Sequence, residues 1–142
     1  MSGPLVAVDT NIFITARNPR EAGHAPCRRF LDRVDRGDVR AIVSTITIAE
    51  LRAGMDAEEI APVWSPMLAH FLTSPNWTVV AVDSDVADFA GEIRADLGLS
   101  LPDAIVISTG QSRGARFLVT QDTKLHRLQL PMTVIGPGKL PE

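Results

Sequence analysis

Short apolar runs alternate with segments of helical periodicity along this chain of 142 residues. Each run is long enough for one buried strand. The runs span residues 4–8, 39–44, 77–82, 116–119 and 132–135. Strands that alternate with helices form a parallel sheet covered by helices on both faces. The sequence therefore predicts an α/β fold with a central parallel sheet of about five strands.

The intervals between the runs carry helix signals. In residues 25–34, apolar residues recur at helical spacing with charged residues between them, and Gly37 follows as a stop signal. Residues 56–74 also look helical, but Pro62 and Pro66 predict a break or two short helices. Four more helices are predicted. The first follows Asp9, and the second runs from a cap at Thr45 or Thr47 to about Gly54. In the third, Val86, Ala90, Ile93 and Leu97 share an apolar face, and Gly98 ends it. The fourth extends from Ser100 to Gly114, and a helical turn is predicted at 124–128.

The length of the chain bears on the number of domains, and its net charge bears on whether it binds nucleic acid. A chain of this length, with 45% hydrophobic residues and no linker or repeat, fits one domain over residues 1–142. Its net charge of −3 argues against binding nucleic acid by overall basicity. Local binding stays open, because 12 of the 14 basic residues are arginines, whose forked side chains suit phosphate.

Cysteine usage and hydropathy bear on location. A single cysteine, Cys27, cannot form an internal disulfide or a zinc-binding pair, and its place on a helix suggests a small packing residue. No signal peptide and no apolar run of about 18 residues is evident. We therefore expect a cytoplasmic protein without a membrane segment.

Four acidic residues stand where strands end or helices begin. Asp9 and Asp122 follow apolar runs, Asp103 opens a helix, and Glu50 lies one turn into a helix entered from a strand. Because the carboxyl ends of parallel strands share one edge of a sheet, we expect the four acids to meet there. Singly, three of them have structural explanations: Asp9 as a helix cap, Asp103 as part of a capping box begun by Ser100, and Asp122 as a turn residue.

Glu50 is harder to explain as a cap. At about 100° per residue it shares a stripe with Ile46, Ala49 and Ala53, which predicts a buried carboxylate that needs a partner. Like charges about 4 Å apart repel by roughly 4 kcal/mol at an effective dielectric near 20, so a cluster of acids requires cations or protons. Oxygen ligands without convergent cysteine or histidine favour Mg²⁺, or Mn²⁺ in its place.

These residues suggest metal-assisted hydrolysis of a phosphodiester. A cation held by acids activates a bound water, and no phosphate-binding glycine loop offers another route. Thr10, Asn11 and Thr120 flank the acids and are candidates for supporting hydrogen bonds. The basic residues near the proposed edge, as possible substrate contacts, are Arg17, Arg52, Arg113 and Lys124. The histidines, His24, His70 and His126, show no ligand spacing and are interpreted as surface or packing residues.

In the sequence around these four acids, the chain resembles the PIN-domain ribonucleases, and among them the VapC-type toxins of prokaryotic toxin–antitoxin pairs. The resemblance covers nearly the whole length. Four short motifs carry it, Val8-Asp9-Thr10-Asn11, Ile48-Ala49-Glu50-Leu51, Pro102-Asp103-Ala104 and Thr120-Gln121-Asp122. Each tripeptide is common by chance, whereas the four in this order are specific.

The resemblance implies Mg²⁺-dependent cleavage of single-stranded or looped RNA, dimerisation, and inhibition by a cognate VapB-type antitoxin in a hetero-oligomer. It implies Asp9 and Asp103 as direct metal ligands, with Glu50 and Asp122 completing the pocket or holding a second ion. The chain departs from the family pattern at Ile107, where relatives often carry a small residue, and in the proline-containing 56–74 region.

Two other functions are compatible with parts of the pattern. A phosphatase or phosphotransferase could use Asp9 as nucleophile, although Asn11 stands where a partner acid is expected. A binding module without catalytic activity could keep the same fold. Covalent phosphorylation of Asp9 would indicate the former, and absence of Mg²⁺ or Mn²⁺ binding would favour the latter.

Overall fold

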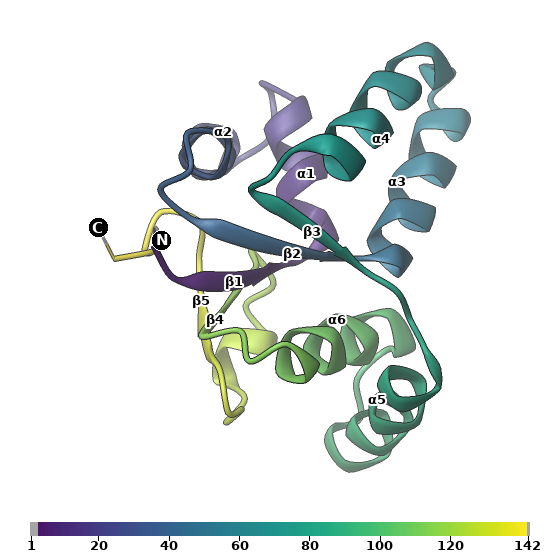
Figure 1. The fold of residues 1–142 in the computed structure, drawn as a ribbon, viewed down its shortest axis with the longest axis vertical. Helices are drawn as coiled ribbons and strands as arrows, with labels where there is room; N and C mark the ends of the chain where they lie inside the picture. The colour runs from purple at the N-terminus through teal and green to yellow at the C-terminus, as the bar shows by residue number, and fades with distance from the viewer. Residues whose placement is uncertain (1–2, 142) are drawn as a thin grey trace.

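Five parallel strands form the central sheet, in the order β3-β2-β1-β4-β5. We describe residues 3–141 from a computed structural model (Figure 1). The chain order is β1 (Leu5–Val8), α1 (Thr10–Arg17), α2 (His24–Asp35), β2 (Arg40–Ser44), α3 (Thr45–Ala57), η1 (Ala61–Val63), α4 (Trp64–Thr73), β3 (Trp77–Val80), α5 (Ser84–Leu97), α6 (Leu101–Ser112), β4 (Phe117–Val119), η2 (Leu125–Arg127) and β5 (Thr133–Ile135). The predicted α/β fold and the five parallel strands are confirmed.

Helices cover both faces of the sheet. Helices α1 to α4 lie on one face, and α5 and α6 lie on the other (Figure 1). Each face has its own core: one is centred on residues such as Phe13, Phe30 and Trp77, and the other on residues such as Ile93 and Leu118. No helix within residues 3–141 is both long and apolar enough to cross a membrane. The sheet is therefore buried on both sides, as its nearly continuous apolar strands require.

Several boundaries differ from the predictions in ways that local chemistry explains. The helix after β2 is capped by Ser44, whose side chain accepts from the Ile46 N–H, rather than by Thr45 or Thr47. The third strand ends at Val80 instead of residue 82. The predicted break in residues 56–74 is present, because α3 ends at Ala57 and η1 precedes α4.

Gly110 sets how closely α6 approaches β1. A Cβ atom placed on it would lie 3.0 Å from the Ala7 Cβ and 3.0 Å from the Met132 Cε. Asp103 belongs to the same helix, and Ala7 to the strand that precedes Asp9. The missing side chain therefore helps to bring the two acids together. Ile107, the bulky residue of α6 at which the chain departs from the family pattern, is fully buried in the core on this face of the sheet.

Replacing Gly110 with alanine should lower the free energy of unfolding by about 1–3 kcal/mol, because the added methyl group overpacks a filled contact. Gly91 in α5 provides a matched control, since a Cβ there meets nothing within 4 Å. Gly91→Ala should raise stability by about 0.5–1 kcal/mol through helix propensity alone. Urea unfolding of both variants measures the difference, and equal effects would contradict the close approach.

Candidate functional site

Asp9 lies at the carboxyl end of β1, where it also begins α1. Its backbone N–H donates to the Val119 carbonyl at 3.0 Å, which extends the pairing of β1 with β4. Its side-chain Oδ1 accepts from the Thr10 N–H at 2.8 Å, so Asp9 is the N-cap of α1. The capping role considered for Asp9 is therefore real, and only 6% of the residue is exposed.

The second oxygen of Asp9 is bound by side chains that follow two different strands. Oδ2 accepts from the Thr120 hydroxyl at 2.7 Å and from the Asn11 amide at 3.2 Å. The Thr120 oxygen in turn accepts from the Asp122 N–H at 3.0 Å and from the Asn11 amide at 3.1 Å. Because the Thr120 oxygen accepts both of these hydrogen bonds, its own proton is free to be donated to Asp9. Thr120, which is fully buried, thus connects the ends of β1 and β4.

The electrostatics of Asp9 bring two other acids into its surroundings. Burial is the main cause that raises the pKa of Asp9, and hydrogen bonds from Thr120 and Thr10 act against it. The charges of Asp103 and Glu50 raise the pKa of Asp9 further. Acids from α3 and α6 therefore lie close enough to repel the Asp9 carboxylate. The meeting of all four acids at this edge stays a prediction.

Glu50 is held by a chain of two threonine hydroxyls. The Thr10 hydroxyl donates to Glu50 Oε1 at 2.7 Å, and the Thr47 and Thr10 hydroxyl oxygens are 2.9 Å apart. Because the single Thr10 proton goes to Glu50, the Thr47 hydroxyl must be the donor to Thr10. Thr47 is fully buried. The chain runs Thr47 to Thr10 to Glu50, with each proton directed toward the carboxylate.

Thr47→Val should weaken the binding of Mn²⁺ at this edge about tenfold, by analogy with residues that orient metal ligands. The valine keeps the shape but cannot donate to Thr10, so the Thr10 hydroxyl loses its fixed orientation toward Glu50. Thr47→Ser keeps the hydroxyl and should restore most of the affinity, although it removes a buried methyl group. Thermal unfolding and the affinity for Mn²⁺ separate the two effects: a role in packing alone predicts that serine is the worse substitution.

The expected burial of Glu50 is wrong, and Asp9 is the buried acid. The inner face of α3 carries Thr47, Leu51 and Met55, whereas Ala49 is exposed and Glu50 is half-buried. The helix has two apolar arcs, and the core that includes residues of α1 and α4 covers the arc with Leu51 and Met55. The repulsion argument still applies, but to Asp9.

Asp122 is a turn residue that also reaches the site through Thr120. Its Oδ1 accepts from the Lys124 N–H at 2.9 Å, which is the turn role considered from the sequence. Its backbone N–H donates to the hydroxyl oxygen of Thr120, the same hydroxyl group that donates to Asp9. Asp103 lies in the first turn of α6, where Ser100 caps its N–H at 3.3 Å.

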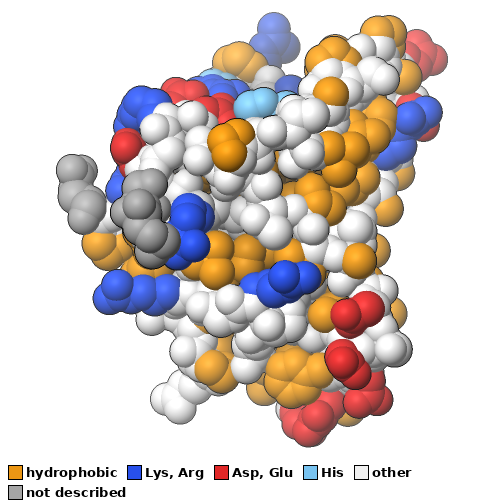
Figure 2. All heavy atoms as spheres, in the orientation of Figure 1, with side chains coloured by type: hydrophobic (Ala, Val, Ile, Leu, Met, Phe, Trp, Pro, Cys, Tyr) orange, Lys and Arg blue, Asp and Glu red, His pale blue; other side chains and the backbone are white. Residues whose placement is uncertain are grey.

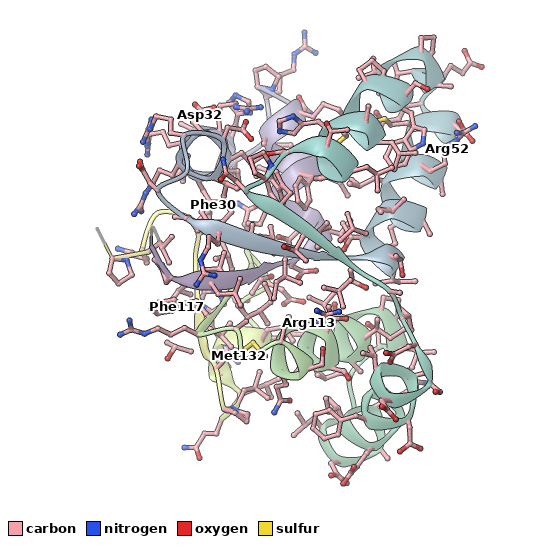
Figure 3. The ribbon with its side chains drawn as sticks, viewed as in Figure 1. Phe30, Asp32, Arg52, Arg113, Phe117 and Met132 are labelled. Carbon is pink, nitrogen blue, oxygen red and sulfur yellow. The ribbon has the colours of Figure 1, made fainter. Side chains whose placement is uncertain are left out.

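The structure does not bring three of the predicted basic contacts to the acids. Arg17 pairs with Glu58 at 3.3 Å beyond the far end of α1. Arg52 pairs with Asp56 at 3.0 Å and points outward from α3 (Figure 3). Arg113 follows the end of α6, about 15 Å along the helix from its first turn at 1.5 Å per residue. Of these four residues, only Lys124 contacts one of the four candidate acids, because its backbone N–H donates to Asp122.

Sequence reasoning missed two residues at this edge. Thr47 was considered only as a cap, although its position three residues before Glu50 places it on a neighbouring part of the helix surface. His126 lies 2.9 Å from the Thr120 carbonyl through Nε2, and nothing in its spacing indicates that contact. The other two histidines contact Thr15 and Asp35, consistent with packing or surface roles.

The donor set fits a hard divalent cation. Among residues 3–141, no three Asp, Glu, His or Cys side chains already stand in position to ligate one ion. The charges of Glu50 and Asp103 nevertheless act on the buried Asp9 carboxylate, and all three residues would offer carboxylate oxygens as ligands. A cation between them would offset that repulsion, and their side chains would turn toward it.

A comparison with protein-family models matches the PIN domain over residues 6–130. Among solved structures, the toxin–antitoxin complex from Klebsiella pneumoniae is 23% identical, with a TM-score of 0.71, and the match covers 95% of this chain and 98% of that chain. VapBC2 from Rickettsia felis, bound to a DNA fragment from its promoter, is 20% identical, with a TM-score of 0.71 and coverage of 93% and 98%. VapC20 from Mycobacterium tuberculosis, a toxin that cleaves the sarcin-ricin loop, is 17% identical, with a TM-score of 0.66 and coverage of 80% and 86%. No curated protein sequence matches the chain. At these identities the structural likeness shows the fold.

Proposed function

Because this chain belongs to the PIN domain family, we propose that it is a metal-dependent endoribonuclease and the toxin of a VapBC-type toxin–antitoxin pair. One observation carries the proposal: a buried carboxylate, Asp9, at the carboxyl end of β1 is repelled by acids from two other elements. The arrangement suits Mg²⁺, with Mn²⁺ able to replace it.

We assign Asp9 and Asp103 as the direct ligands, with Glu50 and Asp122 completing the pocket. When bound, the cation lowers the pKa of a water molecule and neutralises charge on the phosphate. Thr120 and Asn11 fix the Asp9 carboxylate by donating to Oδ2, and Thr10 orients Glu50. These hydrogen bonds keep the oxygens in place while the substrate phosphate enters.

The partners and location follow as further parts of this proposal. The solved structures named above include toxin–antitoxin complexes, which supports a VapB-type antitoxin as partner and a hetero-oligomer or homodimer as the assembly. We place the protein in the cytoplasm, where its RNA substrate is found. We also extend the domain to residues 1–142, since Leu140 packs into the core beyond the end of the family match.

Incubation of the purified protein with single-stranded and stem-loop RNA tests the activity. Cleavage should require Mg²⁺ or Mn²⁺ and stop with EDTA. Water as nucleophile also predicts products without a 2′,3′-cyclic phosphate, because the RNA 2′-hydroxyl takes no part. Cleavage that persists in EDTA, or cyclic phosphate ends, would overturn the proposal.

A further inference from the structure

A hollow lined by arginines lies between α2 and the C-terminal segment, away from the acids. Its volume is about 270 Å³, and its walls include Arg29, Arg33 and Arg36 on one side and residues 137, 138 and 140 on the other. The three arginines are spaced four and three residues apart, so they share one face of α2. Their guanidinium groups therefore gather over a single concave surface.

The wall opposite α2 is fixed in place. Arg33 donates from Nη1 to the Leu140 carbonyl at 3.1 Å and from Nη2 to the Pro141 carbonyl at 2.9 Å. Leu140 is buried in the core, which anchors the segment from below. The guanidinium group of Arg33 therefore holds the wall of the hollow in place, and Arg29 and Arg36 are the arginines available to a ligand.

Three arginines and one acid, Asp32, line this hollow, so positive charge is in excess there. Within residues 3–141, Arg29 makes no ion pair or side-chain hydrogen bond. Arg36 pairs with Asp38 at 3.1 Å, but both side chains are more than half exposed, so the pair contributes little and is easily exchanged. Asp32 also lines the hollow, on the same face of α2, but it pairs with Arg28 at 3.2 Å and is half exposed, so it offsets only part of the positive charge of the three arginines.

Charge is also unevenly spread over the molecule. Acidic side chains gather on α5, at the lower right of Figure 2, whereas basic and acidic side chains are mixed near α2 at the upper left. The sequence of α2 carries three arginines and two aspartates, with Arg36 directly after it, whereas α5 carries four acids and one arginine. The net charge of −3 therefore conceals an excess of positive charge in the hollow, which suits anions.

The start of α2 lies beside the acidic edge. Gly23, the N-cap of α2, sits against the side-chain amide of Gln121 so closely that no Cβ would fit. Gln121 directly precedes Asp122. At 1.5 Å per residue, Arg29 lies about 9 Å along α2 from Gly23, and Arg36 about 20 Å. A strand leaving the acids along α2 would therefore meet Arg29 first and Arg36 afterwards.

We propose that this arginine hollow binds backbone phosphates of the RNA strand beyond the bond that is cleaved. The inference rests on the proposed nuclease function and extends it, because it assigns a path for the substrate. Guanidinium forks pair with phosphate oxygens without reading bases, so the hollow positions the strand and adds no sequence preference.

The salt dependence of RNA binding tests the inference without any cleavage. A short fluorescein-labelled oligouridylate is titrated with protein in EDTA, and anisotropy gives Kd across a range of salt concentrations. For single strands each phosphate contact contributes about 0.7 to the slope of log K against log salt. Arg29→Gln and Arg36→Gln should each lower the slope by about 0.7 and weaken binding about fivefold near 0.1 M salt. Arg94→Gln in exposed α5 is the control with the same charge change, and should leave the slope unchanged.

Failure of this inference is distinguishable from failure of the proposed function. Equal slopes for wild type, both α2 variants and Arg94→Gln, or no RNA binding by wild type, would overturn the hollow as a phosphate site. Lower slopes in the α2 variants support it, even if the wild type does not cleave RNA with Mg²⁺, which would count against the nuclease alone. Circular dichroism of each variant checks that the exposed substitutions leave the fold intact.

Discussion

Asp9→Asn is expected to lower RNA cleavage roughly a thousandfold, the loss typical of removing a central electrostatic group from a catalytic site. Asparagine has nearly the same shape and still caps α1, because its side-chain oxygen can accept from the Thr10 N–H. It cannot supply the negative charge that holds a cation. The initial rate of cleavage at saturating Mg²⁺ measures the effect.

Asp83→Asn is the matched control for Asp9→Asn. Asp83 caps α5 by accepting from the Val86 N–H at 2.8 Å, and it is exposed. The same chemical change at a cap with a purely structural role should leave cleavage within about twofold of wild type. Equal losses in both variants would show that capping, and not charge at the acidic edge, determines the result.

The pH dependence of stability tests the Asp9 electrostatics without RNA. Burial, with the Asp103 and Glu50 charges, raises the Asp9 pKa above 3.8, so the folded state binds the proton more tightly than the unfolded state. The stabilising contribution of this proton is complete below pH 3.8 and is lost as the pH rises through the folded-state pKa. In EDTA, Asp9→Asn should therefore gain stability relative to wild type as the pH rises above 3.8 and through the folded-state pKa of Asp9. A pH-independent difference between their melting temperatures would contradict this account.

Asp103→Asn should lower cleavage about a hundredfold, whereas Asp122→Asn should lower it about tenfold. The Asp103 charge acts on Asp9, as its effect on the Asp9 pKa shows. The Asp122 carboxylate instead accepts from the Lys124 N–H, and its backbone contact with Thr120 survives the substitution. Initial rates for both variants, measured with the same RNA, give the ratio. A larger loss at Asp122 would show that the fourth acid turns toward the cation on binding.

The strands and helices could be predicted because each has a simple period or a clear end signal. Gly98 ends α5 with a positive φ of 68°, and Ser100 caps α6, both as predicted. The place of Asp9 directly after β1 followed from the end of the apolar run alone. The buried face of α3 did not follow, because the helix has two apolar arcs and only the tertiary packing determines which is covered.

The hydrogen bonds of the site could not be predicted for a related reason. Thr47 meets Thr10 across 37 positions of the chain, and Thr120 meets Asp9 across 111. Such contacts depend on side-chain rotamers and on the packing of α3 and β4 against β1. The Arg52–Asp56 pair is different, because it joins residues four apart on one helix and could have been predicted from that spacing.

Calorimetric titration of Mn²⁺ or Mg²⁺ into protein stripped with EDTA tests the central claim most directly, namely that Asp9 and its acidic neighbours bind a divalent cation. Wild type and Asp83→Asn should bind the ion with equal affinity, and Asp9→Asn should bind it at least tenfold more weakly. Tenfold is the smallest loss of metal affinity typically seen when a residue that supports a metal ligand is replaced. Equal affinity in wild type and Asp9→Asn, or no binding in wild type, would contradict the account.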